Sequence, residues 1–339
     1  MFDSVTIKNF RGFESVVADG LGLVNVIVGD NAVGKTTFLE ALYLLSSQSP
    51  EKVFSIRAWR DMDPNLSSET FESGEIWEDV FYRFREDVDI FIDGKGSHNR
   101  SLRIGRLRER AVSLVEGVHY ANIMFTWTVA DGKEYECIPE KHDKQIRFPN
   151  LPPDAVSGAL LTANILTQNL ADQFSKLDAA NEAGDLIRMI CEHWEDVQDL
   201  KILTKGEGKG TLCASLKSLD RKVPLGLASY GLNRLLYVLV TIASFPDGVV
   251  YIDEIDTGLY YERLPDVWGL IYKLASSTRT QIFATTHSGD AVDALLPVIR
   301  DHEADFRLLR ITKELDTPTI HVVKGKALAA AIASHGEVR

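Results

Sequence analysis

The stretch that decides the fold is VNVIVGDNAVGKTTFLE, residues 24–40. An apolar, β-branched run stops at Gly29, and Gly34-Lys35-Thr36 follows after four intervening residues. This is the G-x-x-x-x-G-K-[ST] spacing, in the strand, loop and helix context that it requires. The two glycines let the backbone turn tightly, so that its N–H groups can point at phosphate oxygens, and the start of the helix adds partial positive charge. The stretch therefore predicts a loop that binds ATP or GTP.

Each residue type in this loop has a predicted role. Lys35 is expected to be a point charge for the β- and γ-phosphates, and the Thr36 hydroxyl is expected to be a ligand of Mg²⁺. The predicted ATP-binding residues of the loop are Gly29, Asp30, Asn31, Ala32, Val33, Gly34, Lys35, Thr36 and Thr37.

Composition places the chain among ordinary globular proteins. It has 339 residues, of which 45% are hydrophobic and 25% charged, and its three cysteines are too few and scattered for a disulfide framework or a zinc site. No apolar run reaches the roughly 20 residues that a bilayer span needs. The net charge of −12 argues against a protein that coats nucleic acid by bulk charge. We therefore expect a soluble, cytoplasmic protein with no membrane partner.

Alternating and turn-forming residues predict the regular elements outside the loop. Residues 2–8 and 15–19 are expected to be antiparallel strands. Residues 75–148 are expected to form an antiparallel sheet, with a strand at Phe81–Arg85 and hairpins at Asp93-Gly94 and Asp131-Gly132. Helical spacing then predicts two or three helices in residues 154–200, a long apolar helix that ends near 245, and further buried strands at 248–253 and 280–284.

Two carboxylates end the buried run Val249-Val250-Tyr251-Ile252-Asp253-Glu254. Open α/β sheets bind ligands at the carboxyl ends of such strands. We therefore expect Asp253 to hold Mg²⁺, directly or through water, and Glu254 to orient or deprotonate the attacking water. In a chain without a phosphate loop, the same run would indicate only a strand that ends in a solvated turn.

Two further stretches complete the candidate site. In QIFATTHS, residues 281–288, a buried strand ends near His287, which is predicted to contact the γ-phosphate and to sense hydrolysis; a structural histidine is the alternative. In LASYGL, residues 227–232, Ser229 suits the N-cap of the long apolar helix. The alternative is an anion site at this helix N-terminus, and because one phosphate loop needs no second site in the same molecule, it would serve a nucleotide held by another copy.

The order of these motifs resembles that of the ATP-binding-cassette (ABC) ATPases. Asn9-Phe10-Arg11-Gly12-Phe13 and the run from Tyr251 to Leu259 are similar to the soluble SMC-like and OLD-like branch, often labelled AAA-family ATPases, of bacterial DNA maintenance and anti-phage systems. The likeness covers residues 1–48 and 222–295, and more loosely the helices of 154–220.

The resemblance implies an α/β fold: a P-loop NTPase core of the ABC-ATPase head type, with an antiparallel β-subdomain and a helical insertion. The expected nucleotide-binding core is 1–50 and 221–339. The expected inserted region is 51–220, with the β-subdomain at 75–150 and a mainly helical lid and signature subdomain at 154–220.

The resemblance also implies an activity, ATP hydrolysis to ADP and phosphate, with ATP and Mg²⁺ bound in a head-to-tail homodimer. Each ATP would lie between the phosphate loop of one subunit and Ser229 and Gly231 of the other. Arg11 is then expected near the phosphates, Asp256–Gly258 as the crossing loop, and His287 as the switch. The expected catalytic residues are Lys35, Glu254 and His287.

The sequence departs from the family pattern in ways that bear on function. The transporter signature Leu-Ser-Gly-Gly-Gln is absent, and Tyr260-Tyr261 stand where many relatives carry histidine. Too few residues follow His287 for the toprim nuclease of OLD proteins, so we expect any nuclease to be a separate chain.

Two functions remain open from the sequence. The first is an ATPase of DNA maintenance or antiviral defence. The second is an ATP-gated regulatory subunit that holds or releases a separate effector protein, a toxin or a nuclease. Basic residues are frequent at positions 95–110, and we favour their interpretation as the solvated face of alternating strands. The alternative is a contact with a nucleic-acid backbone or another partner, which makes DNA a possible partner. The basic residues are Lys95, Arg100, Arg103, Arg106, Arg108 and Arg110.

Overall fold

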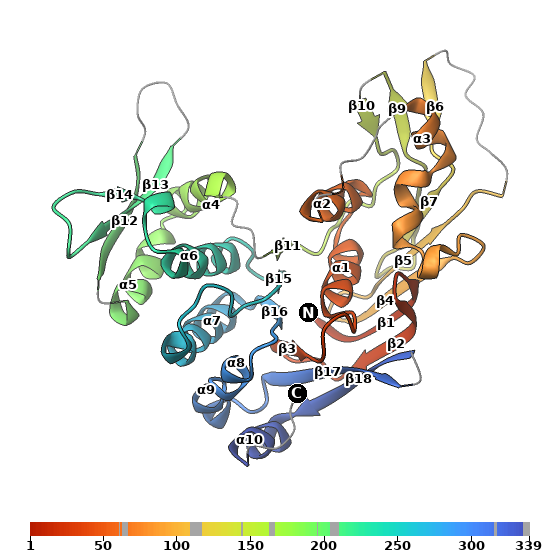
Figure 1. The fold of residues 1–339 in the computed structure, drawn as a ribbon. Helices are drawn as coiled ribbons and strands as arrows, with labels where there is room; N and C mark the ends of the chain where they lie inside the picture. Colours follow the sequence, from red (N-terminus) through yellow and green to blue (C-terminus); the bar gives the residue numbers. More distant parts are fainter. Residues whose placement is uncertain are drawn as a thin grey trace. The chain divides into compact units, whose positions relative to one another are not determined.

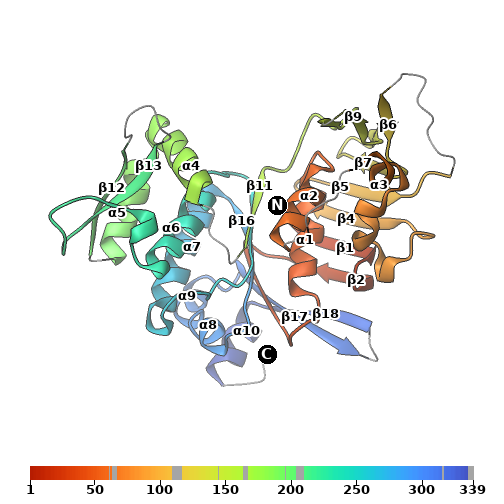
Figure 2. The ribbon, with the colours of Figure 1, turned by 45° about the horizontal axis from the view of Figure 1, so that its top comes forward.

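The computed structural model describes residues 1–60, 62, 67–108, 117–143, 145–162, 167–194, 196–203, 210–314 and 317–334. The chain divides into two compact units, which are described separately below (Figures 1 and 2). The first unit comprises Met1–Leu21, Val28–Gly158 and Leu309–Val322, and the second comprises Gly22–Ile27, Ala159–Leu308 and Val323–Arg339. The predicted core of 1–50 and 221–339 draws on both units, and its boundaries stay a prediction.

A six-stranded antiparallel sheet, in the order β2-β1-β4-β5-β7-β8, forms the frame of the first unit. Its strands are β1 (Phe2–Phe10), β2 (Phe13–Asp19), β4 (Ile90–Gly96), β5 (Arg100–Gly105), β7 (Met124–Thr128) and β8 (Glu134–Cys137). The predicted antiparallel pairing of the first two strands is confirmed. So is the hairpin at Asp131-Gly132, which joins β7 to β8 with Gly132 at a φ of 81°. The predicted α/β class with an antiparallel β-subdomain is thus confirmed.

Two local predictions in this sheet are wrong. Asp93 and Gly94 lie inside β4 and form no turn. A Cβ at Gly94 would come within 2.6 Å of the Phe2 ring, so this glycine allows a close approach between strands rather than a reversal. Phe81–Arg85 is not a strand but contains the 3₁₀ turn η2 (Tyr82–Phe84), because only Phe81 is buried while Phe84 is left 70% exposed.

Helix α1 (Lys35–Ser46) follows the phosphate loop and packs against β4 and β5. Its apolar residues Phe38, Leu39, Leu42 and Leu45 are buried, so the helix is anchored along most of its length. The other elements of the first unit include α2 (Glu51–Trp59), α3 (Ser68–Ser73), η1 (Glu75–Val80) and the small sheet of β6 (Val118–Tyr120), β9 (Glu140–His142) and β10 (Gln145–Arg147). Strands β17 (Phe306–Glu314) and β18 (Thr317–Lys324) are neighbours in the second six-stranded sheet, and most of both belong to this unit.

The second unit is built on buried parallel strands. β15 (Val249–Ile252) pairs with β16 (Gln281–Thr285), and β16 pairs with residues 24–27 of β3 (Val24–Val28), in both cases in parallel. Every residue of the three strands is buried, as their continuous apolar runs predict. Their carboxyl ends therefore lie at one edge of the sheet, and the phosphate loop begins at the residue after β3.

Helix α6 (Tyr230–Ala243) is the long apolar helix predicted from the sequence, and it packs against α7 (Leu264–Thr278) and β15 (Figure 1). The helices expected in 154–200 are α4 (Thr167–Ala179) and α5 (Ala183–His193). The remaining elements are β11 (Gly158–Leu161), the sheet of β12 (Val197–Leu203), β13 (Thr211–Leu216) and β14 (Val223–Pro224), η3 (Leu225–Leu227), η4 (Tyr261–Arg263), α8 (Gly289–Asp293), α9 (Leu296–Asp301) and α10 (Gly325–Ala333). Among the helices described, none is long and apolar enough to cross a bilayer.

Candidate nucleotide-binding and hydrolysis site

The phosphate loop lies in the first unit, between β3 and α1. Asp30, Asn31 and Ala32 are exposed, while Val33 is buried and anchors the loop. Gly34 is the N-cap of α1; it has no side chain that could accept from the amides of the first turn, and this turn carries no acidic residue. An anion at this helix start would therefore meet backbone N–H donors without a competing carboxylate.

Both glycines of the loop occupy positions that a larger residue would strain. Gly29 has a φ of 142° and Gly34 a φ of 111°, which are conformations that L side chains rarely adopt. A Cβ at Gly34 would also lie 2.7 Å from the ring of Phe13, and one at Gly29 would lie 2.2 Å from the carbonyl oxygen of Ile311. The spacing of the motif is thus matched by backbone geometry and by close packing.

The side chain of Lys35 folds back onto its own loop. Its Nζ donates to the carbonyl oxygens of Gly29 at 2.7 Å and Asp30 at 2.8 Å, and the residue is buried. A compact ammonium with several donors can hold loop carbonyls and also face phosphate oxygens. The position fits the role predicted for Lys35, which stays a prediction.

Arg11 lies in a buried network of charges in the same unit. Its guanidinium contacts Oε2 of Glu40 at 3.0 Å and Oδ2 of Asp79 at 3.1 Å. Glu40, on α1, also binds Arg60, and Asp79 also binds Arg57. Burial lowers the pKa of Arg11, and the carboxylate of Glu40 opposes this effect. Arg11 is therefore tied to the helix that follows the phosphate loop, while its predicted contact with phosphate stays a prediction.

This network predicts a stability effect. Glu40→Gln should lower the free energy of unfolding by about 2–3 kcal/mol, because Arg11 and Arg60 lose a buried carboxylate partner. Urea unfolding measures the change. Glu136→Gln, on the exposed face of β8, is the control and should stay within about 0.5 kcal/mol of the parent. An equal effect of both substitutions would contradict the importance of the network.

The acidic part of the site lies in the second unit, at the end of β15. The Thr285 hydroxyl donates to Oδ1 of Asp253 at 2.6 Å and accepts from the backbone N–H of Glu254 at 2.8 Å. The Oε2 atom of Glu254 accepts from the Thr257 hydroxyl at 3.0 Å. Both carboxylates are half-buried and held by hydroxyl groups, so they are oriented at the carboxyl end of the sheet as predicted from the strand pattern.

The next strand connects this acidic pair to the crossing loop. Thr286 donates to Oδ1 of Asp256 and accepts from the backbone N–H of Ser288 at 3.0 Å. His287 lies in the chain between Thr286 and Ser288, the N-cap of α8, and it is exposed. An exposed imidazole on an anchored backbone suits the role of a phosphate sensor, and this role of His287 stays a prediction.

Ser229 is the N-cap of α6, and its hydroxyl accepts from the N–H of Leu232 at 3.3 Å. The capping interpretation is thus observed, while the proposed anion site stays a prediction. A Cβ at Gly231 would lie 2.9 Å from the carbonyl oxygen of Gly258, and one at Gly258 would lie 2.0 Å from the ring of Tyr230. The Ser229–Gly231 stretch and the crossing loop therefore pack directly against each other.

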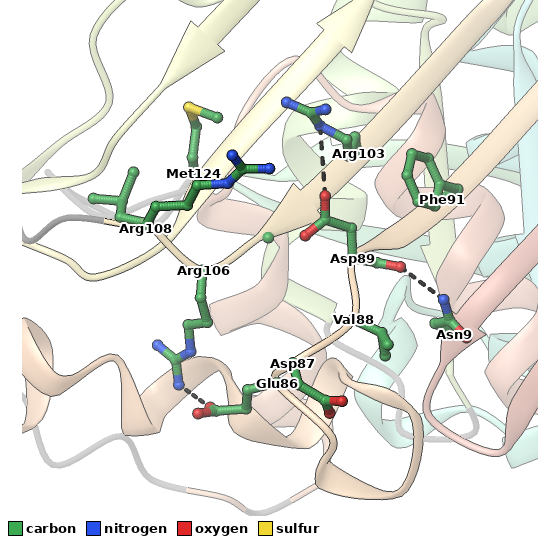
Figure 3. A pocket seen from close by; sticks show the side chains of 12 residues that line it. Asn9, Glu86, Asp87, Val88, Asp89, Phe91, Arg103, Arg106, Arg108 and Met124 are labelled. Carbon is green, nitrogen blue, oxygen red and sulfur yellow. Dashed lines mark hydrogen bonds and ion pairs between the residues drawn. The ribbon is translucent and has the colours of Figure 1, made fainter.

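The basic run is only partly available to a partner. Arg100 is buried and donates to the carbonyl oxygens of Ser47 and Asp154. A hollow of about 750 Å³ is lined by residues of β4 and β5, among others. In it Arg106 is paired with Glu86, and Arg103 lies 3.9 Å from Asp89 (Figure 3). Arg110 lies outside the described residues. A contact with DNA is thus left to the exposed members Lys95, Arg103 and Arg108, and it stays a prediction.

Each unit offers an oxygen donor of the kind that Mg²⁺ prefers. Thr36 has a hydroxyl in the first unit, and Asp253 has a carboxylate in the second. Within the described ranges, no group of three or more His, Cys, Asp or Glu side chains could form a metal cage. Mg²⁺ commonly takes one or two protein ligands and completes its shell with water and phosphates, so the small donor set is compatible with it.

Three residues of the acidic part were not predicted from the sequence as functional. Thr285 and Thr286 stand inside a quoted motif, but nothing in their spacing indicates which oxygen they bind. Arg234 is a single charge within an apolar helix, and this was the one available signal; its guanidinium donates to the carbonyl oxygens of Asp253 and Glu254.

Comparisons with known proteins find ATPases. A model described as "AAA ATPase domain" matches residues 1–150, and one described as "AAA domain, putative AbiEii toxin, Type IV TA system" matches residues 150–293. The chain is 23% identical over 344 residues to an "ATP/GTP phosphatase" of Helicobacter pylori, with 90% of each chain covered. It is 48% identical over 44 residues to the "DNA replication and repair protein RecF" of Oenococcus oeni, which is 13% of this chain and 12% of that protein.

Among solved structures, the chain is similar to the "SMC head domain from Thermotoga maritima". The identity is 14%, the coverage is 95% of this chain and 99% of that one, and the TM-score is 0.46. The two AAA models abut at residue 150 and together account for residues 1–293, including the phosphate loop and the acidic strand. The predicted resemblance to the AAA-labelled ATPases is confirmed, since each of these two models is described as an AAA domain and each matches close to half of the chain.

Proposed function

We propose that this ATPase is an ABC-type head that forms a nucleotide-sandwich homodimer and acts in DNA maintenance or anti-phage defence. The observation that carries the proposal is the packing of the Ser229–Gly231 stretch on Gly258, five residues after Asp253. The stretch that we propose as a second anion site thus lies against the crossing loop, and the acidic pair belongs to the same unit. Such a unit can complete a triphosphate site that is held by the phosphate loop of another copy.

Each part of the site then has a role in hydrolysis. The loop amides and Lys35 bind and orient the triphosphate, and Thr36 and Asp253 hold Mg²⁺, which when bound neutralises charge on the phosphates. Glu254 accepts the proton of the attacking water, or orients this water for attack on the γ-phosphate. His287 contacts the γ-phosphate and reports its loss.

Exposed apolar side chains support a second copy as the partner. Leu227, Tyr230, Tyr260 and Tyr261 are 77%, 49%, 60% and 54% exposed, and all four lie at the N-terminus of α6 or just after the crossing loop. Aromatic residues are enriched in protein interfaces, and grouped exposed apolar side chains are uncommon on surfaces without a partner. The surface around Ser229 therefore has the composition of an interface.

An assembly measurement tests the proposal. With Mg²⁺ and a non-hydrolysable ATP analogue, the molar mass measured by light scattering should double. Ser229→Arg should prevent this dimerisation, because a bulky cation replaces the exposed hydroxyl at the helix N-terminus. Ser15→Arg, on the exposed strand β2, is the matched control and should dimerise as the parent does. A dimer in the Ser229 variant, or no change of mass with nucleotide in the parent, would count against the proposal.

The alternative function is that of an ATP-gated subunit that holds or releases a separate toxin or nuclease. The description of the model matched by residues 150–293 favours it, because that description names a toxin–antitoxin system. Turnover distinguishes the two. Stimulation of ATP hydrolysis by duplex DNA supports the first function. A rate of ATP hydrolysis that DNA does not change, together with a stoichiometric complex with the product of a neighbouring gene, supports the second.

A further inference from the structure

The backbone of Glu254 is in an unusual conformation. Its φ is 51°, in the left-handed region that residues other than glycine and asparagine seldom occupy. Such a conformation persists only where the surroundings hold it in place, and it is found preferentially at functional sites.

Two side chains hold the peptide groups on either side of this residue. Nη2 of Arg234 donates to the carbonyl oxygens of Asp253 at 2.7 Å and of Glu254 at 3.2 Å. The Thr285 hydroxyl accepts from the N–H of Glu254 at 2.8 Å. We call Arg234 and Thr285 the Glu254 clamp. They come from α6 and from β16, two elements that flank the end of β15.

Burying the charged side chain of Arg234 at this position carries a desolvation cost. It is completely buried, and the hydrogen bonds of its guanidinium described above go to backbone carbonyl oxygens. Its third contact, from Nη1, is to the carbonyl oxygen of Thr162. Burial lowers its pKa, and the carboxylates of Asp253 and Glu254 are among the groups that oppose this effect. Because apolar residues usually fill a buried site at a lower free-energy cost than a charged group, the guanidinium serves a geometric purpose that an apolar residue could not.

We propose that Arg234 and Thr285 are positioning residues that hold Glu254 in its left-handed conformation for ATP hydrolysis. Arg234 stands on the helix whose N-cap is Ser229, so it also links the proposed dimer contact to the group that handles the attacking water. The inference rests on the proposed function, since it takes Glu254 as that group. Neither positioning residue needs to touch the nucleotide.

Arg234→Lys tests the clamp, because lysine keeps the charge but loses the planar pair of donors that reaches two carbonyl oxygens. We expect kcat to fall about 10- to 100-fold, which is part of what a positioned base contributes, with KM for ATP within about threefold of the parent. The matched control is Arg100→Lys. Arg100 is also a buried arginine that donates to two backbone carbonyls, but it lies away from the acidic pair in sequence and in unit. The substitution Arg100→Lys should lower the melting temperature without lowering kcat.

A double-substitution cycle separates positioning from general stability. In a Glu254→Gln background, Arg234→Lys should lower turnover no further, because the residue acts through Glu254. Turnover of folded Arg234→Lys at the parental rate, or an equal loss in Arg100→Lys, would overturn the inference. If Glu254→Gln itself keeps parental turnover, then the proposed function fails first, and this result is distinct from a failure of the clamp.

Thr285 provides a second test that does not depend on the folding of an arginine variant. Thr285→Val removes the acceptor of the Glu254 N–H with little change of volume, whereas Thr285→Ser keeps the hydroxyl. We expect kcat to fall about tenfold or more in the valine variant and to stay near the parent in the serine variant. Equal kcat values in the two variants would overturn the clamp.

Discussion

Glu254→Gln is expected to lower kcat about 100- to 10 000-fold, the range that a positioned general base contributes, while ATP still binds. Glutamine keeps the size of the side chain and can still accept from the Thr257 hydroxyl, which contacts Oε2 of Glu254 at 3.0 Å. It cannot accept a proton from water at neutral pH. The loss should therefore appear in the chemical step and not in nucleotide affinity.

Phosphate release under single-turnover conditions, together with equilibrium binding of ATP, measures this difference. Because the variant retains ATP, it should also accumulate as the nucleotide-bound dimer in light scattering. Glu136→Gln on exposed β8 serves as the control and should turn over at the parental rate. Parental turnover in Glu254→Gln, or a monomer at saturating ATP, would show that Glu254 or the sandwich has been assigned wrongly.

The sequence was sufficient for those parts of the site that are contiguous in the chain. The phosphate loop is one run of residues between a strand and a helix, and Asp253 and Glu254 directly follow a continuous apolar strand, so spacing alone predicts where they lie. Thr285 and Arg234 differ, because Thr285 binds Asp253 from 32 positions away in the sequence and Arg234 binds it from 19 positions away. No local pattern states which distant oxygen a buried hydroxyl or guanidinium will meet. Only packing of the strands and of α6 determines this.

Arg11 and Gly94 show a second limit, which is that one residue type serves several purposes. The glycine after Asp93 has the sequence of a turn, but it is required because Phe2 packs over it in the sheet. The resemblance to the ABC ATPases predicts that Arg11 lies near the phosphates. In the structure its guanidinium contacts Glu40 and Asp79. In both cases the neighbours that the structure gives the residue, Phe2 for Gly94 and Asp79 for Arg11, lie far from it in the sequence, so only the folded chain identifies them.

Lys35→Ala is expected to weaken ATP binding about 100-fold or more, because one charge-assisted hydrogen bond of about 3 kcal/mol is lost at the phosphates. The loop should also lose its internal support, since Nζ of Lys35 donates to the carbonyl oxygens of Gly29 and Asp30 at 2.7 and 2.8 Å. The amides of the loop would remain, but without the ammonium they would be less well oriented and would carry less positive charge. Turnover at ordinary ATP concentrations should fall below detection.

Isothermal titration with ATP and Mg²⁺ measures the affinity, and Lys8→Ala, on the exposed face of β1, is the matched control. The two variants can be distinguished because Glu254→Gln is impaired in hydrolysis and Lys35→Ala is impaired in ATP binding. Glu254→Gln should bind ATP and dimerise without hydrolysis. Lys35→Ala should bind little ATP and form little dimer at ATP concentrations that saturate the parent, and adding more ATP should restore part of its dimer. If Lys35→Ala bound ATP at the parental affinity, the loop lysine would not contact the phosphates, and the assignment of the phosphate loop as the nucleotide site would have to be abandoned.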